Sequence, residues 1–99
     1  YDFSDVFRRP FQALAKKNDV LIAITTSGNS ANIIKVLKDA RSKKITTLGF
    51  LGGSGGKCKK LCDIRLIVPS KSTARIQECH IFLGHFIFEQ VENLILKKL

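Results

Sequence analysis

Two kinds of hydrophobic spacing alternate along the chain. Residues 19–24 form an almost continuous apolar run, which is typical of a strand covered on both faces in a parallel sheet. The next stretch repeats apolar residues at helical spacing, at Ile33, Ile34, Leu37 and Ala40. Continued along the chain, the pattern predicts strands over 20–25, 45–51 and 64–68, a helix over about 30–43 and a helical turn over 57–62.

Both ends of the chain read as helical. Residues 4–17 predict a helix capped by Ser4, in which Pro10 fits only a break or a first-turn position. A long helix over about 72–98, with Ser72 or Thr73 as N-cap, contains no proline. Its core stripe is Ile76, Leu83, Ile87, Val91 and Leu94, and further apolar residues on its other faces predict partners beyond this sheet.

Strands that alternate with helical stretches predict an α/β fold, a three-layer sandwich in which helices flank a parallel sheet. Ligands of such sheets bind beyond the carboxyl ends of the strands. Three candidate segments fall at that edge: the hydroxyl-rich turn after the first strand, the glycine loop 52–56 and Pro69-Ser70. The glycine loop is equally well explained as a mobile linker, so no site is assigned to it.

The turn after the first strand is the best candidate for chemistry. It carries four hydroxyl side chains within six positions, Thr25, Thr26, Ser27 and Ser30, together with Gly28. A helix N-terminus adds free amides and the positive end of the helix dipole, so the turn predicts a phosphate cradle. A simple helix cap is the rival interpretation. Because the lysine-bearing P-loop and the three-glycine dinucleotide motif are absent, a sugar phosphate fits better than a nucleotide.

Composition narrows the class without deciding it. Ninety-nine residues with 44% hydrophobic content make at most one small domain, and a chain that starts at Tyr1 without methionine is expected to be the C-terminal portion of a longer product. The net charge of +9 raises nucleic acid as a partner, but the lysines are dispersed and no aromatic residues interleave with them. We therefore expect no nucleic-acid partner.

Three cysteines, an odd number, and the lack of a secretory signal or membrane span predict a reduced, cytoplasmic protein. Cys58 and Cys62 have the spacing of a zinc-finger pair, but no second pair completes a tetrahedral site. We expect them to be structural, with Cys62 packed inward.

The final helix carries polar residues among its apolar ones. Gln77 and His85, eight residues apart, fall within one broad face. A histidine on an apolar helix face is usually a core or interface residue, which we expect of His80. The same explanation holds for His85 unless other evidence favours a titrating base near the cradle.

The motif from Thr26 to Ser30, followed by Pro69-Ser70, the run Thr73 to Glu78, His80 and the Gly84-His85 pair, resembles the sugar-isomerase (SIS) domain of bacterial phosphoheptose isomerases. The similarity runs through almost the whole chain, which would then be the C-terminal part, residues 1–99, of a single such domain. Among sugar-isomerase domains, the Arg-Ile-Gln-Glu and Gly-His elements favour the phosphoheptose isomerase branch.

The resemblance implies isomerisation of sedoheptulose 7-phosphate to glycero-manno-heptose 7-phosphate, on the route to lipopolysaccharide or related surface glycans. His85 would be the base, and Gln77 would contact sugar oxygens or a bound zinc. Thr25, Thr26, Ser27 and Ser30 would hold the phosphate. The resemblance also implies a homotetramer with sites between subunits, and no nucleotide cofactor.

Zinc is less well supported by the residues themselves. Gln77 and His85 lie roughly 12 Å apart along a straight helix at about 1.5 Å per residue, so one ion joins them only with a strained reach or with help from a neighbouring subunit. The family's other ligands, a histidine and a glutamate, lie on an upstream helix that this sequence lacks. We therefore expect the 99-residue chain to be inactive alone. A non-catalytic sugar-isomerase module, which binds a phosphosugar or a bacterial replication initiator, is the alternative.

Overall fold

The computed structural model describes residues 3–98 and follows the predicted order of elements. The helices are α1 (Arg8–Leu14), α2 (Ala31–Ser42) and α3 (Thr73–Lys98), with short 3-10 helices η1 (Phe3–Asp5) and η2 (Lys57–Leu61), and the strands are β1 (Val20–Ile24), β2 (Thr46–Gly52) and β3 (Ile64–Val68). The predicted strands agree with these bounds to within one residue.

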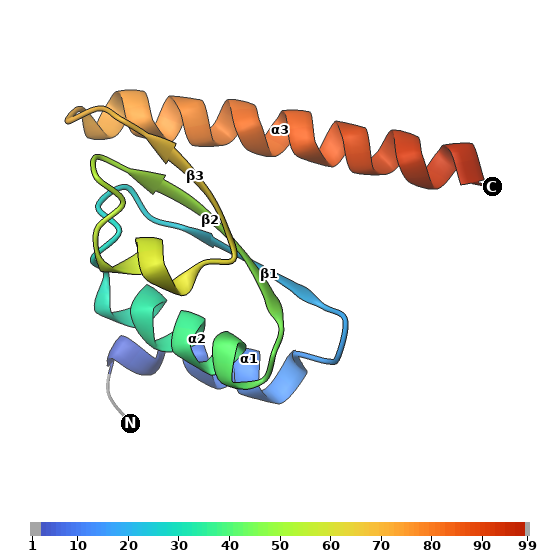
Figure 1. Cartoon of the computed structure of the whole chain (residues 1–99), viewed down its shortest axis with the longest axis horizontal. Helices are drawn as coiled ribbons and strands as arrows, with labels where there is room; N and C mark the ends of the chain where they lie inside the picture. Colours follow the sequence, from blue (N-terminus) through green and yellow to red (C-terminus); the bar gives the residue numbers. More distant parts are fainter. Residues whose placement is uncertain (1–2, 99) are drawn as a thin grey trace.

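The three strands form one parallel sheet in the order β1-β2-β3, with Ala23 opposite Gly49 and Gly49 opposite Arg65. Helix α2 packs on one face of the sheet with α1 beside it, and α3 crosses the other face (Figure 1). The predicted α/β three-layer arrangement is therefore confirmed. All three strands end at the same edge, so the segments that follow them are neighbours.

The core lies between the sheet and α2. It is built from small and medium apolar side chains, namely Ala23, Leu37, Leu51, Cys58 and Cys62. Leu37, Leu51 and Cys58 are fully buried. Cys62 packs inward as predicted, and all three cysteines are free thiols.

The N-terminal helix differs from the prediction. In place of one helix over 4–17, a 3-10 turn at Phe3–Asp5 precedes α1, which begins at Arg8. Pro10 then occupies the first turn, where its missing N–H costs no intrahelical hydrogen bond. The ring of Pro10 would clash with a helical residue four positions earlier, so the helix cannot extend back to Ser4.

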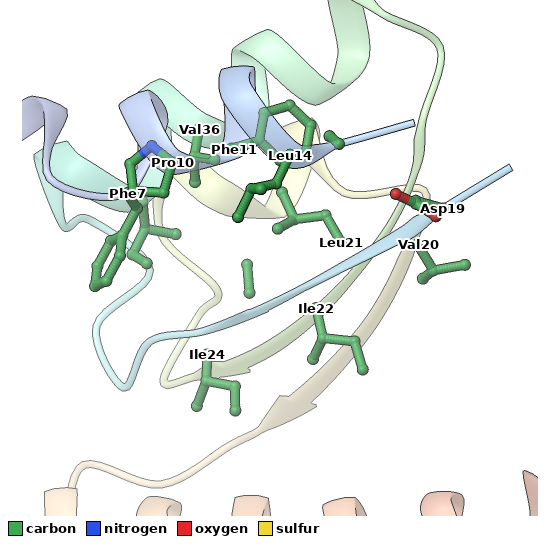
Figure 2. Close-up of a pocket in the computed structure, with 13 residues that line it drawn as sticks. Phe7, Pro10, Phe11, Leu14, Asp19, Val20, Leu21, Ile22, Ile24 and Val36 are labelled. Atoms are coloured by element: carbon green, nitrogen blue, oxygen red, sulfur yellow. The ribbon is translucent and has the colours of Figure 1, made fainter. Parts of the chain in front are cut away.

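Strand β1 is less covered than its sequence predicted. It is at one edge of the described sheet, and Val20 and Ile24 are more than half exposed. A cleft of about 580 Å³ follows this edge. In Figure 2, Phe11 and Leu14 of α1 lie on one side of β1, and Ile22 and Ile24 point to the other side. The cleft is apolar except for Asp19, so it contains little that could act chemically.

Only the N-terminal part of α3 packs on the sheet. Ile76 and His80 are its buried residues, Leu83 and Ile87 are partly buried, and the stripe beyond them is exposed because the helix runs past the sheet (Figure 1). Of the helices within residues 3–98, none is long and apolar enough to cross a membrane.

Candidate functional site: a hydroxyl-rich turn beside the α3 groove

The turn between β1 and α2 is held by its own side chains. The Thr25 hydroxyl lies 3.2 Å from the Ser30 hydroxyl and accepts a hydrogen bond from the Gly28 amide, also at 3.2 Å. The Ser27 hydroxyl accepts from the Asn29 amide at 3.1 Å. Ser30 is the N-cap residue of α2 and has an extended backbone, but its hydroxyl does not cap the helix. The helix-cap rival therefore fails for Ser30, and its hydroxyl faces Thr25 instead.

The glycine loop supports this turn. The Cys58 amide donates to the Gly28 carbonyl at 2.8 Å, and the Lys57 amide donates to the Asn29 side-chain oxygen at 2.8 Å. A Cβ atom on Gly56 would lie only 2.7 Å from the Gly28 carbonyl oxygen, so the two loops touch backbone to backbone. Gly28 and Gly56 are needed for this close approach, so the loop is not a linker without a structural role.

A groove of about 480 Å³ lies between β1, β2 and α3. Ile22, Ile24 and Phe50 form its floor, and α3 supplies Gln77, His80 and His85 along its wall. Ile24 is the last residue of β1, directly before Thr25. The groove therefore begins where the hydroxyl-rich turn begins.

His80 is the most constrained polar residue of the groove. It is 3% exposed, its Nε2 lies 2.8 Å from the Leu51 carbonyl oxygen, and its ring centroid lies 5.8 Å from that of Phe50. A carbonyl only accepts hydrogen bonds, so Nε2 carries the proton. The Nδ1 atom is buried and has no partner among the described residues. The expectation that His80 is a core residue is thus confirmed, and its two ring nitrogens differ in that only Nε2 has a partner among the described residues.

The structure brings the predicted site residues into two adjoining groups. Gln77 and His85 are exposed and line the same groove, and Thr25, Thr26, Ser27 and Ser30 belong to the turn that follows Ile24, a residue of the groove floor. Within the turn the exposures differ: Thr25 is buried, Thr26 and Ser30 are partly exposed, and Ser27 is exposed. Thr25 is thus committed to the turn itself, while the other three are accessible to a ligand.

Sequence reasoning missed the supporting residues of this site. The pattern of hydroxyls gives Asn29 no role, but its side-chain oxygen accepts a hydrogen bond from the Lys57 amide and so joins the turn to η2. The four glycines between 52 and 56 were the available signal, because several glycines at a strand end indicate close backbone approach as well as flexibility.

The donors on this chain do not make a metal site. Residues 3–98 contain no group of three or more histidine, cysteine, aspartate or glutamate side chains that could hold a metal ion. Gln77 and His85 offer two donors along one wall, whereas a zinc site in a protein normally has at least three protein ligands. A zinc ion at this groove would therefore need donors from beyond the described residues.

Comparison with known proteins agrees with the topology and with the motifs. No protein-family model matches the chain. The phosphoheptose isomerase of Clostridium acetobutylicum is 50% identical over 93 residues, which cover 94% of this chain and 47% of the relative. This chain is homologous to phosphoheptose isomerases. The phosphoheptose isomerase of Aquifex aeolicus is 47% identical over 98 residues, covering 99% of this chain and 51% of the relative.

The solved structures extend this homology to three dimensions. A phosphoheptose isomerase from Neisseria gonorrhoeae superposes with a TM-score of 0.87 at 40% identity, covering 90% of this chain and 51% of that one. One from Francisella tularensis gives 0.80 at 38% identity, covering 84% and 45%. The chain thus spans about half the length of the phosphoheptose isomerases it matches, and over that half it has their fold.

Proposed function

We propose that this chain provides the phosphate-binding and base-bearing part of a sugar-phosphate isomerase. The observation that carries the proposal is the junction at Ile24, where the hydroxyl-rich turn meets the groove that Gln77 and His85 line. A phosphate at the turn would extend its sugar along that groove. The homology to phosphoheptose isomerases supports sedoheptulose 7-phosphate as the substrate and D-glycero-D-manno-heptose 7-phosphate as the product.

The proposed binding mode follows from what the turn leaves accessible. Thr26, Ser27 and Ser30 offer hydroxyls, and the first turn of α2 offers amides that have no backbone acceptor within the helix. Of these, the Ile33 amide already donates to the Asn32 side-chain oxygen. Thr25 contributes by ordering the turn through Ser30 and the Gly28 amide. A phosphate held away from the reacting carbons adds binding energy that orients the other end of the sugar.

The proposed chemistry is a proton transfer between neighbouring carbons. His85 takes the proton from C1 of the ketose, the carbonyl oxygen on C2 gains a proton, and the enediol forms. Return of a proton to C2 and loss of the proton on O1 give the aldose, so no external oxidant or reductant is needed. Gln77, on the same face of α3, would donate its amide N–H to the sugar oxygens while negative charge develops on them.

Zinc, the homotetramer and the cytoplasmic location remain part of the proposal. Gln77 and His85 would be the two zinc ligands from this chain, and further ligands would come from outside the described residues. The exposed apolar side chains of α3 support assembly with other subunits. Nothing in the proposed chemistry requires a nucleotide, and heptose synthesis for surface glycans would place the protein in the cytoplasm.

The test is a single substitution with two readouts in the native protein that contains this chain. His85→Ala should lower isomerisation of sedoheptulose 7-phosphate by a factor on the order of 10² to 10⁴, because it removes the general base. Binding of inorganic phosphate, measured by calorimetry, should change by less than about twofold, because His85 is outside the turn and phosphate contacts are local.

Glu89→Ala is the matched control, since Glu89 is an exposed α3 residue that does not line the groove. It should leave both readouts unchanged. Turnover by His85→Ala at the wild-type rate would exclude the base role and favour the non-catalytic sugar-phosphate module. Loss of phosphate binding along with turnover would mean that His85 acts on the structure of the turn.

A further inference from the structure

Helix α3 is attached to the sheet at very few points. Among its described residues only Ile76 and His80 are buried, and they are one helical turn apart. The Ile76 side chain packs on Gly52, where a Cβ atom would lie 2.7 Å from Ile76 Cδ1. The His80 imidazole holds the carbonyl of Leu51, the preceding residue. Both attachments therefore fall on the last two residues of β2 before the glycine loop.

Gly52, the second of these residues, also touches the hydroxyl-rich turn. A Cβ atom on Gly52 would also overlap the Thr26 carbonyl oxygen, so Gly52 is enclosed between the turn and Ile76. The turn, the end of β2 and α3 meet there. The position of α3 relative to the turn is decided at this junction.

The two attachments differ in directionality. Apolar packing of Ile76 on a glycine limits distance but tolerates rotation and sliding of the helix. The His80–Leu51 hydrogen bond fixes direction as well, because the N–H must point at the carbonyl oxygen. Its tautomer is set by the carbonyl, and its ring is further constrained by Phe50.

From this geometry we infer that His80 is a positioning residue: its bond to the Leu51 carbonyl holds Gln77 and His85 at the distance from the phosphate turn that one sugar phosphate spans. Gln77 comes three residues before His80 and His85 five after it, so a rotation of α3 about its axis moves both. This inference rests on the proposed function, because it concerns the placement of the proposed catalytic residues. The hydrogen bond between His80 and Leu51 can still be tested without measuring activity.

The first experiment measures the bond in the wild-type protein. Nitrogen-15 NMR of the His80 ring should show a protonated Nε2 and an unprotonated Nδ1, and the Ile76 methyl group should show a nuclear Overhauser effect to the Gly52 α-protons. A ring protonated at Nδ1 instead would overturn the inference.

The second experiment compares three variants in the native protein that contains this chain. His80→Gln keeps an amide donor at the reach of Nε2, His80→Asn has a donor that is one methylene too short, and His80→Leu has none. With sedoheptulose 7-phosphate we expect kcat to fall about tenfold or more in the Asn and Leu variants, because a misplacement of about 1 Å can cost on the order of a hundredfold. His80→Gln should recover most of kcat.

Phosphate affinity should stay within about twofold in all three variants, because the turn is held by Lys57 and Cys58 amides that these substitutions do not touch. Equal loss of kcat in the Gln, Asn and Leu variants, or no loss in any, would overturn the inference. If the wild-type protein shows no turnover, the proposed function fails. The inference is then tested by the nuclear Overhauser effect between the Ile76 methyl group and the Gly52 α-protons. This effect should weaken in His80→Asn and persist in His80→Gln. An unchanged effect in both variants would overturn the inference.

Discussion

At the scale of single residues, Gly28 determines the shape of the phosphate turn. Its φ of +72° is a left-handed conformation that costs other residues about 1–2 kcal/mol, and a Cβ atom there would overlap the Gly55 carbonyl oxygen. Gly28→Ala should therefore lower the free energy of unfolding by about 2–4 kcal/mol, because backbone strain and a backbone overlap add together. Urea denaturation of the chain measures the loss.

Gly53→Ala is the matched control for this prediction. Gly53 has a similar φ of +61°, but the nearest atom to its Cβ position is the Ser70 carbonyl oxygen at 3.9 Å. Only the conformational cost remains, so a loss of about 1 kcal/mol is expected. Equal losses for the two variants would show that the contact between the turn and the glycine loop contributes nothing.

At the scale of elements, η2 and the residue that follows it bury the thiols of Cys58 and Cys62 under the sheet. Burial raises the pKa of Cys58 from 9.0 to about 11, with a smaller contribution from Cys62, and burial also raises the pKa of Cys62. Below pH 9 the folded and unfolded states both hold the Cys58 proton. Between about pH 9 and 11 only the folded state keeps it, so unfolding releases a proton and stability falls as pH rises.

This fall is expected to reach up to about 3 kcal/mol for a shift of two pKa units. Because lysines titrate in the same range, the measurement is the difference between wild type and Cys58→Ala in urea denaturation at pH 8 and pH 11. The wild type should lose more stability than the variant. Parallel losses would mean that Cys58 is not buried as described.

Cys79, which is exposed, should be alkylated by iodoacetamide before either buried cysteine.

At the scale of the whole molecule, α3 presents more apolar surface than this chain covers. Phe86, Val91, Leu94 and Ile95 are all at least 46% exposed, on a helix that continues past the sheet (Figure 1). Burying one such side chain stabilises an interface by about 1.5–3 kcal/mol. The proposed homotetramer would supply that burial.

Light scattering coupled to size-exclusion chromatography tests this assembly in the native protein that contains this chain. The wild-type protein should have the mass of four subunits, and Phe86→Lys with Leu94→Lys should reduce the mass, because charges would replace buried apolar contacts. Lys97→Ala, an exposed position on the same helix, should leave the mass unchanged. A wild-type protein that stays monomeric at micromolar concentration contradicts the homotetramer.

Much of the fold could be predicted because its signals are local. The strands and α2 have patterns of hydrophobic spacing within single short segments, and their bounds differ from the prediction by one residue at most. The predicted bounds of the N-terminal helix were wrong, although Pro10 does occupy the first-turn position that the sequence allowed it, because the apolar pattern alone extended the helix back to Ser4. The predicted burial of β1 on both faces and of the whole α3 stripe was also wrong, because burial depends on which elements pack against a segment in the tertiary structure.

The hydroxyls of the turn and the placement of Gln77 and His85 on one helix face were determined by the sequence itself, since both follow from spacing along one element. Only the tertiary structure decided that the glycine loop supports the turn and that His80 joins α3 to the end of β2. These contacts join residues 28 to 55 and 51 to 80, which are far apart in the chain. Their energies depend on close approach of backbones and on hydrogen-bond direction, and neither is encoded in the periodicity of any single segment.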